Sequence, residues 1–258
     1  MNPVLGQKES DKATHPAVES FLLAGQRLIW LLKWCVIALV LVLGFALAAV
    51  HVLARTTYMP SEKVFVAQLY TDDIWWHPTD KAYAKVLLRE AMAAGEVKAQ
   101  YRLARDYEKE KNYTEAFPLH QDLALKGFTA SQTRLGLMYM DGRGVSQNTA
   151  VAIRWLKSAA AQGDATAHYF IGWIYLGELP DMPQDLAQAM QWFQSSAYLG
   201  DGQARDVMAR FYATGKGVPE DLDLAMRWAK SSLDAGYGEA TKTIELIQTI
   251  RAEKGQKK

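Results

Sequence analysis

Few residues of this sequence have the types and spacing that chemistry needs, and the most suggestive stretch is GRGVSQN at residues 142–148. Two glycines flank an arginine and a helix-like run follows, an order that resembles a phosphate-binding loop. The common nucleotide-binding loops, however, follow a strand and carry a third glycine or a Lys-Ser/Thr pair. Both features are missing here, and TGKGV (214–218) repeats the pattern at the same position of a later unit. We therefore interpret GRGVSQN as a turn between two helices.

Other motifs for catalysis or metal binding are not found either. The histidines are His15, His51, His77, His120 and His168. They do not pair at the spacing of metal ligands, and the single cysteine, Cys35, lies in an apolar run where we expect a buried hydrophobe. The acidic stretch PEDLD (219–223) opens a helix, where carboxylates favour the positive end of the dipole. We expect no catalytic residue, no cofactor and no metal, and predict that the chain is not an enzyme.

Composition narrows the class of protein further. The 258 residues carry 29 Lys and Arg against 28 Asp and Glu, so the overall charge gives no reason to expect a nucleic-acid partner. Helix-forming residues dominate and alternating, strand-like patterns are few. The chain is therefore predicted to be all-α.

The elements that position any site come from an internal repeat. Equivalent glycines recur at intervals of 32, 36, 37 and 36 residues, a period typical of helical solenoids. These glycines are Gly95, Gly127, Gly163, Gly200 and Gly236. Eleven residues before each lies an alanine, and fifteen before each lies an Asp or Asn suited to cap a helix. The capping residues are Asp80, Asn112, Asn148, Asp185 and Asp221. Each unit therefore contains one helix that starts at a cap and stops at a glycine.

Another helix precedes this capped helix in each unit. We call the preceding helix the first-type helix and the capped helix the second-type helix. The segments YRLARDY, TRLGLMY, YFIGWIY and DVMARFY place an aliphatic residue, then Ala or Gly, then Tyr three residues later. The small residues are Ala104, Gly136, Gly172 and Ala209. Because glycine within a helix costs about 1 kcal/mol relative to alanine, we expect close helix packing at these positions as compensation.

The stretch LGLMYMDGRGVSQNTAVAIRWLKSAAAQG resembles a Sel1-like repeat, a relative of the tetratricopeptide repeat. The resemblance covers repeats at about 97–127, 129–163, 165–200 and 202–236 within a solenoid at 79–251. A lone second-type helix (79–95) and a lone first-type helix (238–251) are expected to close the two ends. The fold class predicted is a right-handed α-solenoid of Sel1-like, tetratricopeptide-like hairpins plus one N-terminal transmembrane helix.

That transmembrane helix is predicted from residues 34–54, which carry no formal charge over 21 positions. A cleaved signal peptide would have a shorter apolar core closer to the N-terminus, so a signal anchor is favoured. Basic residues are more frequent before the span than after it, which predicts a cytoplasmic N-terminus and a C-terminal domain outside the cytoplasm. We expect a disordered tail at 1–16, an amphipathic lead-in and span at 17–54, a linker at 55–78 and a flexible basic tail at 252–258.

The linker contains VFVAQLYTDDIWWHP (64–78), for which two interpretations remain open. It is either a segment packed over the end of the first repeat or a docking site, with Trp75 and Trp76, for another membrane protein.

Candidate binding residues come from the face of the first-type helices opposite the aliphatic positions. They are Tyr101, Arg105, Leu137, Tyr169, Trp173 and Arg210. Aromatic side chains and arginine are enriched at binding hot spots. In related repeats this helix lines the concave groove, so the resemblance implies a groove with an apolar floor and basic ends. The alternative is that neighbouring helices cover these side chains.

Three functions are compatible with this sequence. The favoured one is a membrane-anchored scaffold that binds another protein, a membrane or envelope protein, in the cell envelope, with residues 34–54 in the lipid bilayer. The second is a module that binds glycan or peptidoglycan fragments on Tyr169 and Trp173, and the third is an enzyme with an unrecognised site. The oligomeric state and the identity of the partner do not follow from the sequence.

Overall fold

The fold was analysed in a computed structural model, which describes residues 33–46, 49, 59–71, 80–177, 179 and 182–255. Within these residues the chain is helical and contains no strand. After a helix at 33–46, the helices are α2 (Pro60–Thr71), α3 (Lys81–Ala93), α4 (Val97–Lys109), α5 (Tyr113–Leu125), α6 (Thr129–Asp141), α7 (Thr149–Ala160), α8 (Ala165–Tyr175), α9 (Leu186–Tyr198), α10 (Gly202–Thr214), α11 (Leu222–Asp234) and α12 (Ala240–Gly255). The prediction of an all-α solenoid is confirmed for the part of the chain that is described.

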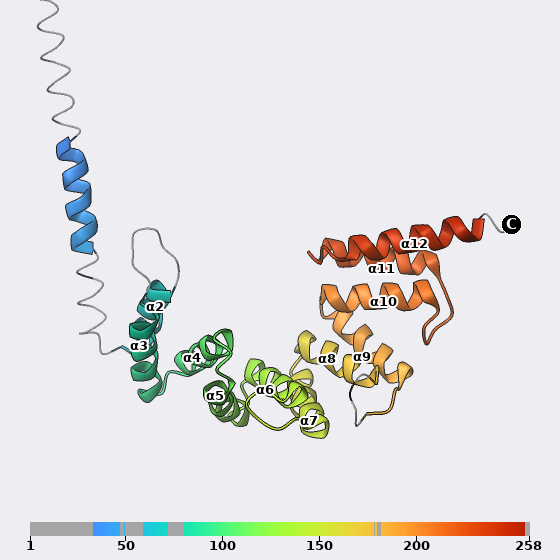
Figure 1. Ribbon diagram of the computed structural model, residues 1–258, viewed down its shortest axis with the longest axis horizontal. Helices are drawn as coiled ribbons and strands as arrows, with labels where there is room; N and C mark the ends of the chain where they lie inside the picture. Colours follow the sequence, from blue (N-terminus) through green and yellow to red (C-terminus); the bar gives the residue numbers. More distant parts are fainter. Residues whose placement is uncertain are drawn as a thin grey trace, which may run out of the picture.

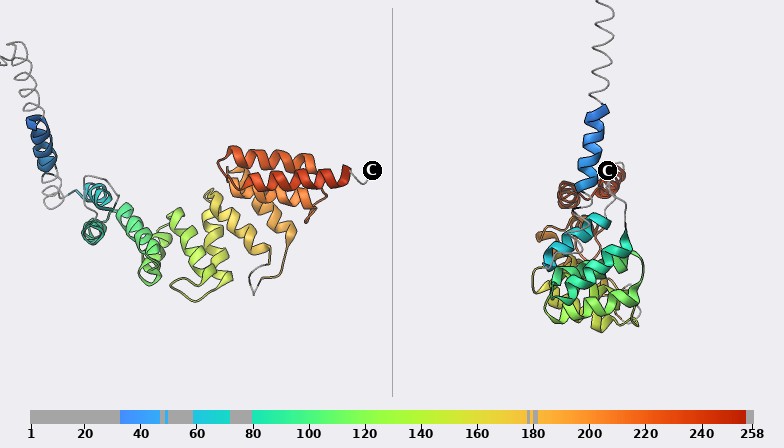
Figure 2. Two further views of the ribbon diagram at one scale, coloured as in Figure 1. Left: turned by 45° about the horizontal axis from the view of Figure 1, so that its top comes forward. Right: turned by 90° about the vertical axis from the view of Figure 1, so that its left-hand side faces the viewer.

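The helices form successive antiparallel pairs that follow an open arc (Figure 1). Each pair packs mainly on the pair before it and the pair after it, which can also be followed in the left-hand view of Figure 2. First-type helices of consecutive units also contact each other, as α6 contacts α8 and α10 contacts α12. In Figure 1, α4 and α6 accordingly lie on the side toward which the arc opens, with α5 and α7 on the outer side. We call the surface of α4, α6, α8 and α10 on the open side the inner face.

The ends of the second-type helices lie where the repeat predicts them. The five glycines Gly95, Gly127, Gly163, Gly200 and Gly236 all have positive φ, between 83° and 102°. Asn148 caps α7 by accepting a hydrogen bond from the backbone N–H of Val151, and equivalent caps start α3, α9 and α11. Asn112 precedes α5 without such a bond. The capping prediction is therefore confirmed at four of the five positions.

This difference gives a matched pair of substitutions. We expect Asn148→Ala to lower the free energy of unfolding by about 1 kcal/mol, because it removes a cap that satisfies an otherwise unpaired N–H. Asn112→Ala removes no cap bond to the backbone and should cost measurably less. Urea denaturation of both variants checks this expectation, and equal losses would show that the cap bond at Asn148 is not what stabilises α7.

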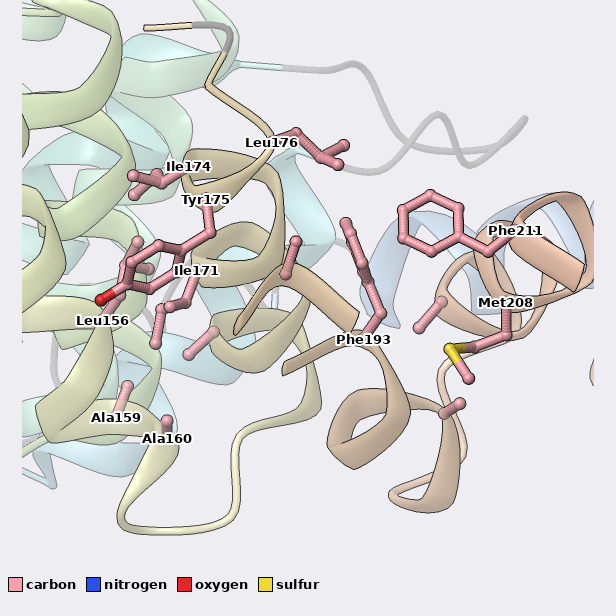
Figure 3. Packing of buried hydrophobic residues seen from close by; sticks show 14 residues of the cluster. Leu156, Ala159, Ala160, Ile171, Ile174, Tyr175, Leu176, Phe193, Met208 and Phe211 are labelled. Carbon is pink, nitrogen blue, oxygen red and sulfur yellow. The ribbon is translucent and has the colours of Figure 1, made fainter. Parts of the chain in front are cut away.

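The close packing predicted at the helix glycines is observed. A Cβ added to Gly136 would lie 2.7 Å from the Leu156 side chain, and one on Gly172 would lie 3.0 Å from the Phe193 ring. Phe193 also faces Met208 and Phe211 of the next unit, with a ring-centroid distance of 6.0 Å to Phe211 (Figure 3). The core therefore continues from one repeat into the next.

The N-terminal end differs from the expected lone helix at 79–95. Helix α3 is paired with α2, which also contacts α4, and Val66, Ala67 and Tyr70 of α2 are buried in the same apolar cluster as Leu87. The expectation of an unpaired α3 was wrong, because α2 is a further first-type helix: Val66, Ala67 and Tyr70 repeat the order of an aliphatic residue, a small residue and a tyrosine three residues later. At the other end, α12 packs on α11 and α10.

The proposed membrane segment, residues 34–54, is only partly described by the structure. Residues 33–46 and 49 are helical, whereas residues 47, 48 and 50–58 lie outside the described residues. Within the described residues, no helix combines the length and the apolar character that crossing a bilayer requires.

Candidate functional site

The glycine-rich loop is a connection between repeats. Gly142 and Gly144 have φ of 71° and 72°, and the stretch joins α6 to α7 as predicted. A Cβ on Gly144 would lie 2.7 Å from the carbonyl carbon of Tyr113, the first residue of α5. At the equivalent Gly217, an added Cβ would lie 3.1 Å from the Cβ of Leu186, the first residue of α9, which is a milder contact with a side chain. The second glycine of each loop therefore lies against the preceding repeat, and at Gly144 the contact is with the backbone.

The candidate binding residues belong to two rows across the inner face. The residues of one row lie six positions after the repeat glycines, and those of the other row lie ten positions after them. The inner row contains Tyr101, Thr133, Tyr169 and Asp206. Neighbouring side chains cover it. Tyr101 packs edge-on against Phe128 and Tyr169 packs edge-on against Phe193, while Thr133 and Asp206 are buried. In this row, therefore, neighbouring helices cover the side chains, as the second of the two interpretations expects.

The second row stays accessible. It contains Arg105, Leu137, Trp173 and Arg210, the first three half-buried and the last exposed. These residues occupy one position on four successive first-type helices, so they lie along the inner face with the apolar pair in the middle and an arginine at each end. This row is the surface that a partner can reach.

Trp173 also lines an apolar cavity. The cavity has a volume of about 260 Å³ and is enclosed by side chains of α6, α8 and the segment after α8. Its lining residues are Met140, Phe170, Trp173, Ile174 and Leu179. A cavity of this kind accepts a single apolar side chain rather than a large ligand, because ligand pockets usually start at about 300 Å³.

A charged cluster lies between the first and second repeats, where α4 faces α6. The Glu108 carboxylate lies 3.8 Å from the Nε atoms of both Arg105 and Arg134. Burial raises the pKa of Glu108, and the two arginines oppose that effect. The cluster holds two guanidinium groups for one carboxylate, so it is positive.

His120 lies beneath this cluster and is fully buried. Its Nδ1 is 3.2 Å from the Ser131 hydroxyl, and its Nε2 is 3.6 Å from Glu108, beyond hydrogen-bond distance. Burial, and then the charges of Arg134 and Arg105, lower the pKa of His120 from 6.5 to about 4. The imidazole is therefore neutral at physiological pH.

A second ion pair marks the other end of the accessible row. Arg210 donates two hydrogen bonds to one carboxylate oxygen of Asp206, whose side chain is completely buried. The other carboxylate oxygen, Oδ1, has no hydrogen-bond partner among the residues that the structure describes. Removal of Arg210 alone would leave a buried carboxylate without its counter-ion, which is strongly destabilising.

Two groups of residues give no site. Trp75 and Trp76 lie outside the described residues, so their docking role stays a prediction. Within the described part of the chain, no cluster of three His, Cys, Asp or Glu side chains could hold a metal ion.

Sequence reasoning missed several residues of this surface. Glu108 and His120 occupy positions that carry different residue types in the other repeats, so no periodic signal marks them. Arg134 shares its position with Arg102, seven residues after the repeat glycines Gly127 and Gly95. By contrast, Gln132 and Arg205 share one position and both donate to a carbonyl in the last turn of the preceding second-type helix, Ala124 and Ala197. A search for polar residues five positions after the repeat glycines would have found this pair.

The architecture defines the chain as a helical repeat protein with an accessible inner face. Comparison with known proteins gives the family. The model of the Sel1 repeat matches residues 97–121, 129–164, 165–201 and 204–237, about half of the chain, and the protein belongs to the Sel1 repeat family. Proteins with this repeat generally act through protein–protein interaction.

Solved structures agree with this assignment. The chain is similar to a Sel1 repeat protein from Oxalobacter formigenes, with 28% identity, a TM-score of 0.64, and coverage of 72% of this chain and 74% of that one. It is also similar in fold to a protective antigen of uropathogenic Escherichia coli, with 23% identity and a TM-score of 0.65 over 77% of this chain and 43% of that one.

Proposed function

We propose that the protein is an interaction scaffold that binds a partner protein of the cell envelope through its inner face. The observation that carries the proposal is the accessible row on four successive helices, in which Leu137 and Trp173 lie between Arg105 and Arg210. A half-buried tryptophan beside an apolar cavity is a typical binding hot spot, because a partner side chain can complete the packing around it.

The membrane anchor belongs to the same proposal. Residues 34–54 hold the chain in the bilayer, and the excess of basic residues before them orients the repeats outside the cytoplasm. A reporter enzyme that works only outside the cytoplasm, fused after residue 258, should be active. Activity of a reporter that works only in the cytoplasm would reverse this orientation.

The binding proposal is tested with the full-length protein carrying a C-terminal affinity tag. Trp173→Ala should reduce the capture of the partner from membrane extracts at least about tenfold, since truncation of a hot-spot tryptophan removes most of the binding energy. Tyr198→Ala is the matched control, because Tyr198 is an exposed aromatic residue on α9, at 71% exposure. Quantitative mass spectrometry compares the proteins captured by the two variants, and thermal melts verify that both are folded.

The proposal fails if Trp173→Ala captures the same proteins in the same amounts as the unchanged chain. Arg210 is unsuitable as a single substitution, because its loss exposes the protein to the cost of the buried Asp206 charge. The double variant Asp206→Asn with Arg210→Gln removes both charges together and separates binding from stability.

Glycan binding is the weaker alternative on geometric grounds. A sugar stacks on the open face of an aromatic ring, whereas Tyr169 is covered by Phe170 and Phe193. The rings of Tyr169 and Trp173 meet at 64°, so they do not form one flat platform. Titration with soluble cell-wall fragments is therefore expected to leave the tryptophan fluorescence unchanged, and saturable quenching would favour the glycan function instead.

A further inference from the structure

The ion pairs of the inner face share an orientation. In each, the carboxylate lies deeper than the guanidinium group that it binds. Glu108 is 15% exposed, whereas Arg105 and Arg134 are each 38% exposed. Asp206 is not exposed at all, whereas Arg210 is 53% exposed. The surface therefore presents positive charge to solvent although the chain as a whole is nearly neutral.

This positive surface is interrupted by apolar side chains at one place. Position by position along the inner face, the arginines of α4 and α6 are replaced on α8 by Phe170 and Trp173, which line the 260 Å³ cavity, and α10 then presents Arg210. The order along the arc is basic, apolar and basic. The apolar cavity at α8 therefore lies between the arginines of α4 and α6 and the arginine of α10.

We propose that the segment bound on the inner face is an extended acidic peptide with one apolar side chain that enters the cavity beside Trp173. The proposal rests on the proposed function, since it specifies the chemistry of the partner at the same surface. Glutamate or aspartate side chains of the peptide pair with Arg105 and Arg134 on one side of the cavity and with Arg210 on the other. Charge-assisted bonds to guanidinium groups orient the peptide, and the apolar side chain supplies burial.

The length of the peptide follows from the helix spacing. Packed helices lie roughly 10 Å apart, so three intervals of this size set a lower limit of about 30 Å for the distance from α4 to α10. An extended chain rises about 3.3 Å per residue, and at least about nine residues are needed to reach from Arg105 to Arg210.

The shape and lining of the inner face favour an acidic peptide over two other anionic partners, a lipid bilayer and a nucleic-acid strand. The inner face lies on the side toward which the arc of helices opens (Figure 1), and a flat bilayer surface does not follow a concave face. A single nucleic-acid strand carries the right charge, but the cavity beside Trp173 is lined mostly by apolar side chains, and its small volume of about 260 Å³ suits an apolar side chain better than a base. A peptide supplies both the charge and the apolar side chain.

The test uses defined peptides and the full-length protein in detergent. The probe is a fluorescein-labelled peptide of about eleven residues that alternates Glu and Ser around one central Phe, with acetylated and amidated ends. Two comparison peptides replace the Phe with Ala or each Glu with Lys. Fluorescence polarisation should show saturable binding of the probe, at least about tenfold weaker binding of the Ala peptide, and no saturable binding of the Lys peptide.

Variants of the protein locate the bound peptide. Arg105→Gln should weaken the probe several-fold while the Glu108 carboxylate keeps Arg134 as its partner. Trp173→Ala should abolish the advantage of Phe over Ala in the peptide. Arg154→Gln, on the exposed surface of the outer helix α7, removes the same charge away from the inner face and should leave binding unchanged.

The outcomes are distinguishable. If Trp173→Ala loses the natural partner but no acidic peptide binds, or if the Lys peptide or a single-stranded oligonucleotide of the same length binds equally well, the acidic-peptide proposal is overturned and the proposed function stands. If Trp173→Ala retains the natural partner, the proposed function itself is overturned. Binding of the probe with the stated pattern of losses supports both.

Discussion

Gly144→Ala is expected to lower the free energy of unfolding by roughly 2–5 kcal/mol, the sum of a left-handed backbone penalty and overpacking. Gly144 has a φ of 72°, which an alanine adopts only with strain. The added methyl group would also lie 2.7 Å from the carbonyl carbon of Tyr113, and closer still to its oxygen. The methyl group is fixed to the backbone of the loop, and the carbonyl group belongs to the backbone of the preceding repeat. Neither group can therefore rotate away from the other.

Gly142→Ala is the matched control for this prediction. Gly142 has almost the same φ, 71°, but an added methyl group would meet its nearest neighbour, in Gln147, at an ordinary 3.5 Å. Thermal or urea denaturation of both variants separates the strain, which they share, from the clash, which only Gly144→Ala has. Equal losses of stability would mean that the contact between the loop and Tyr113 does not hold the repeats together.

Acidification is expected to destabilise the protein through His120. The pKa of His120 is about 4 in the folded protein and 6.5 in the unfolded chain, so between these values the unfolded chain binds more protons. The stabilisation is complete above pH 6.5 and is lost as the pH falls toward 4. With these two pKa values, linkage gives a loss of about 2 kcal/mol between pH 7 and pH 5.

The control is His120→Gln, which stays neutral over the whole range and can still hydrogen-bond Ser131. Glu108 has a raised pKa, which stabilises the fold toward low pH, so only the difference between the two proteins isolates the histidine. Urea denaturation at pH 7 and pH 5 should give a larger acid loss for the unchanged chain. Parallel losses in the two proteins would mean that His120 does not cause the loss of stability in acid.

The repeat could be predicted from sequence because its signals are local. A glycine with positive φ, such as Gly163, and a cap three residues before a paired N–H, such as Asn148, depend on only a few neighbouring residues. Five copies in phase then confirm one another. The pairing of α2 with α3 was not predicted, although Val66, Ala67 and Tyr70 carry the pattern of the other first-type helices.

The candidate surface could be predicted only in part for the same reason. Spacing on one helix identifies the side of the helix on which Arg105 or Trp173 lies, but not whether the next helix covers it. The depth of Asp206 and the burial of His120 depend on neighbouring repeats, and their positions carry different residue types elsewhere in the chain. Burial of single polar residues is decided by packing between repeats, which periodicity does not describe.

Contacts in this chain join mainly helices that are neighbours in sequence. Local contacts of this kind lower the loop-closure entropy that the chain must overcome, so such proteins fold quickly and from more than one starting point. Each hairpin can complete its packing while the following one is still being synthesised at the ribosome. This order of events leaves only the most recent hairpin unprotected at any moment.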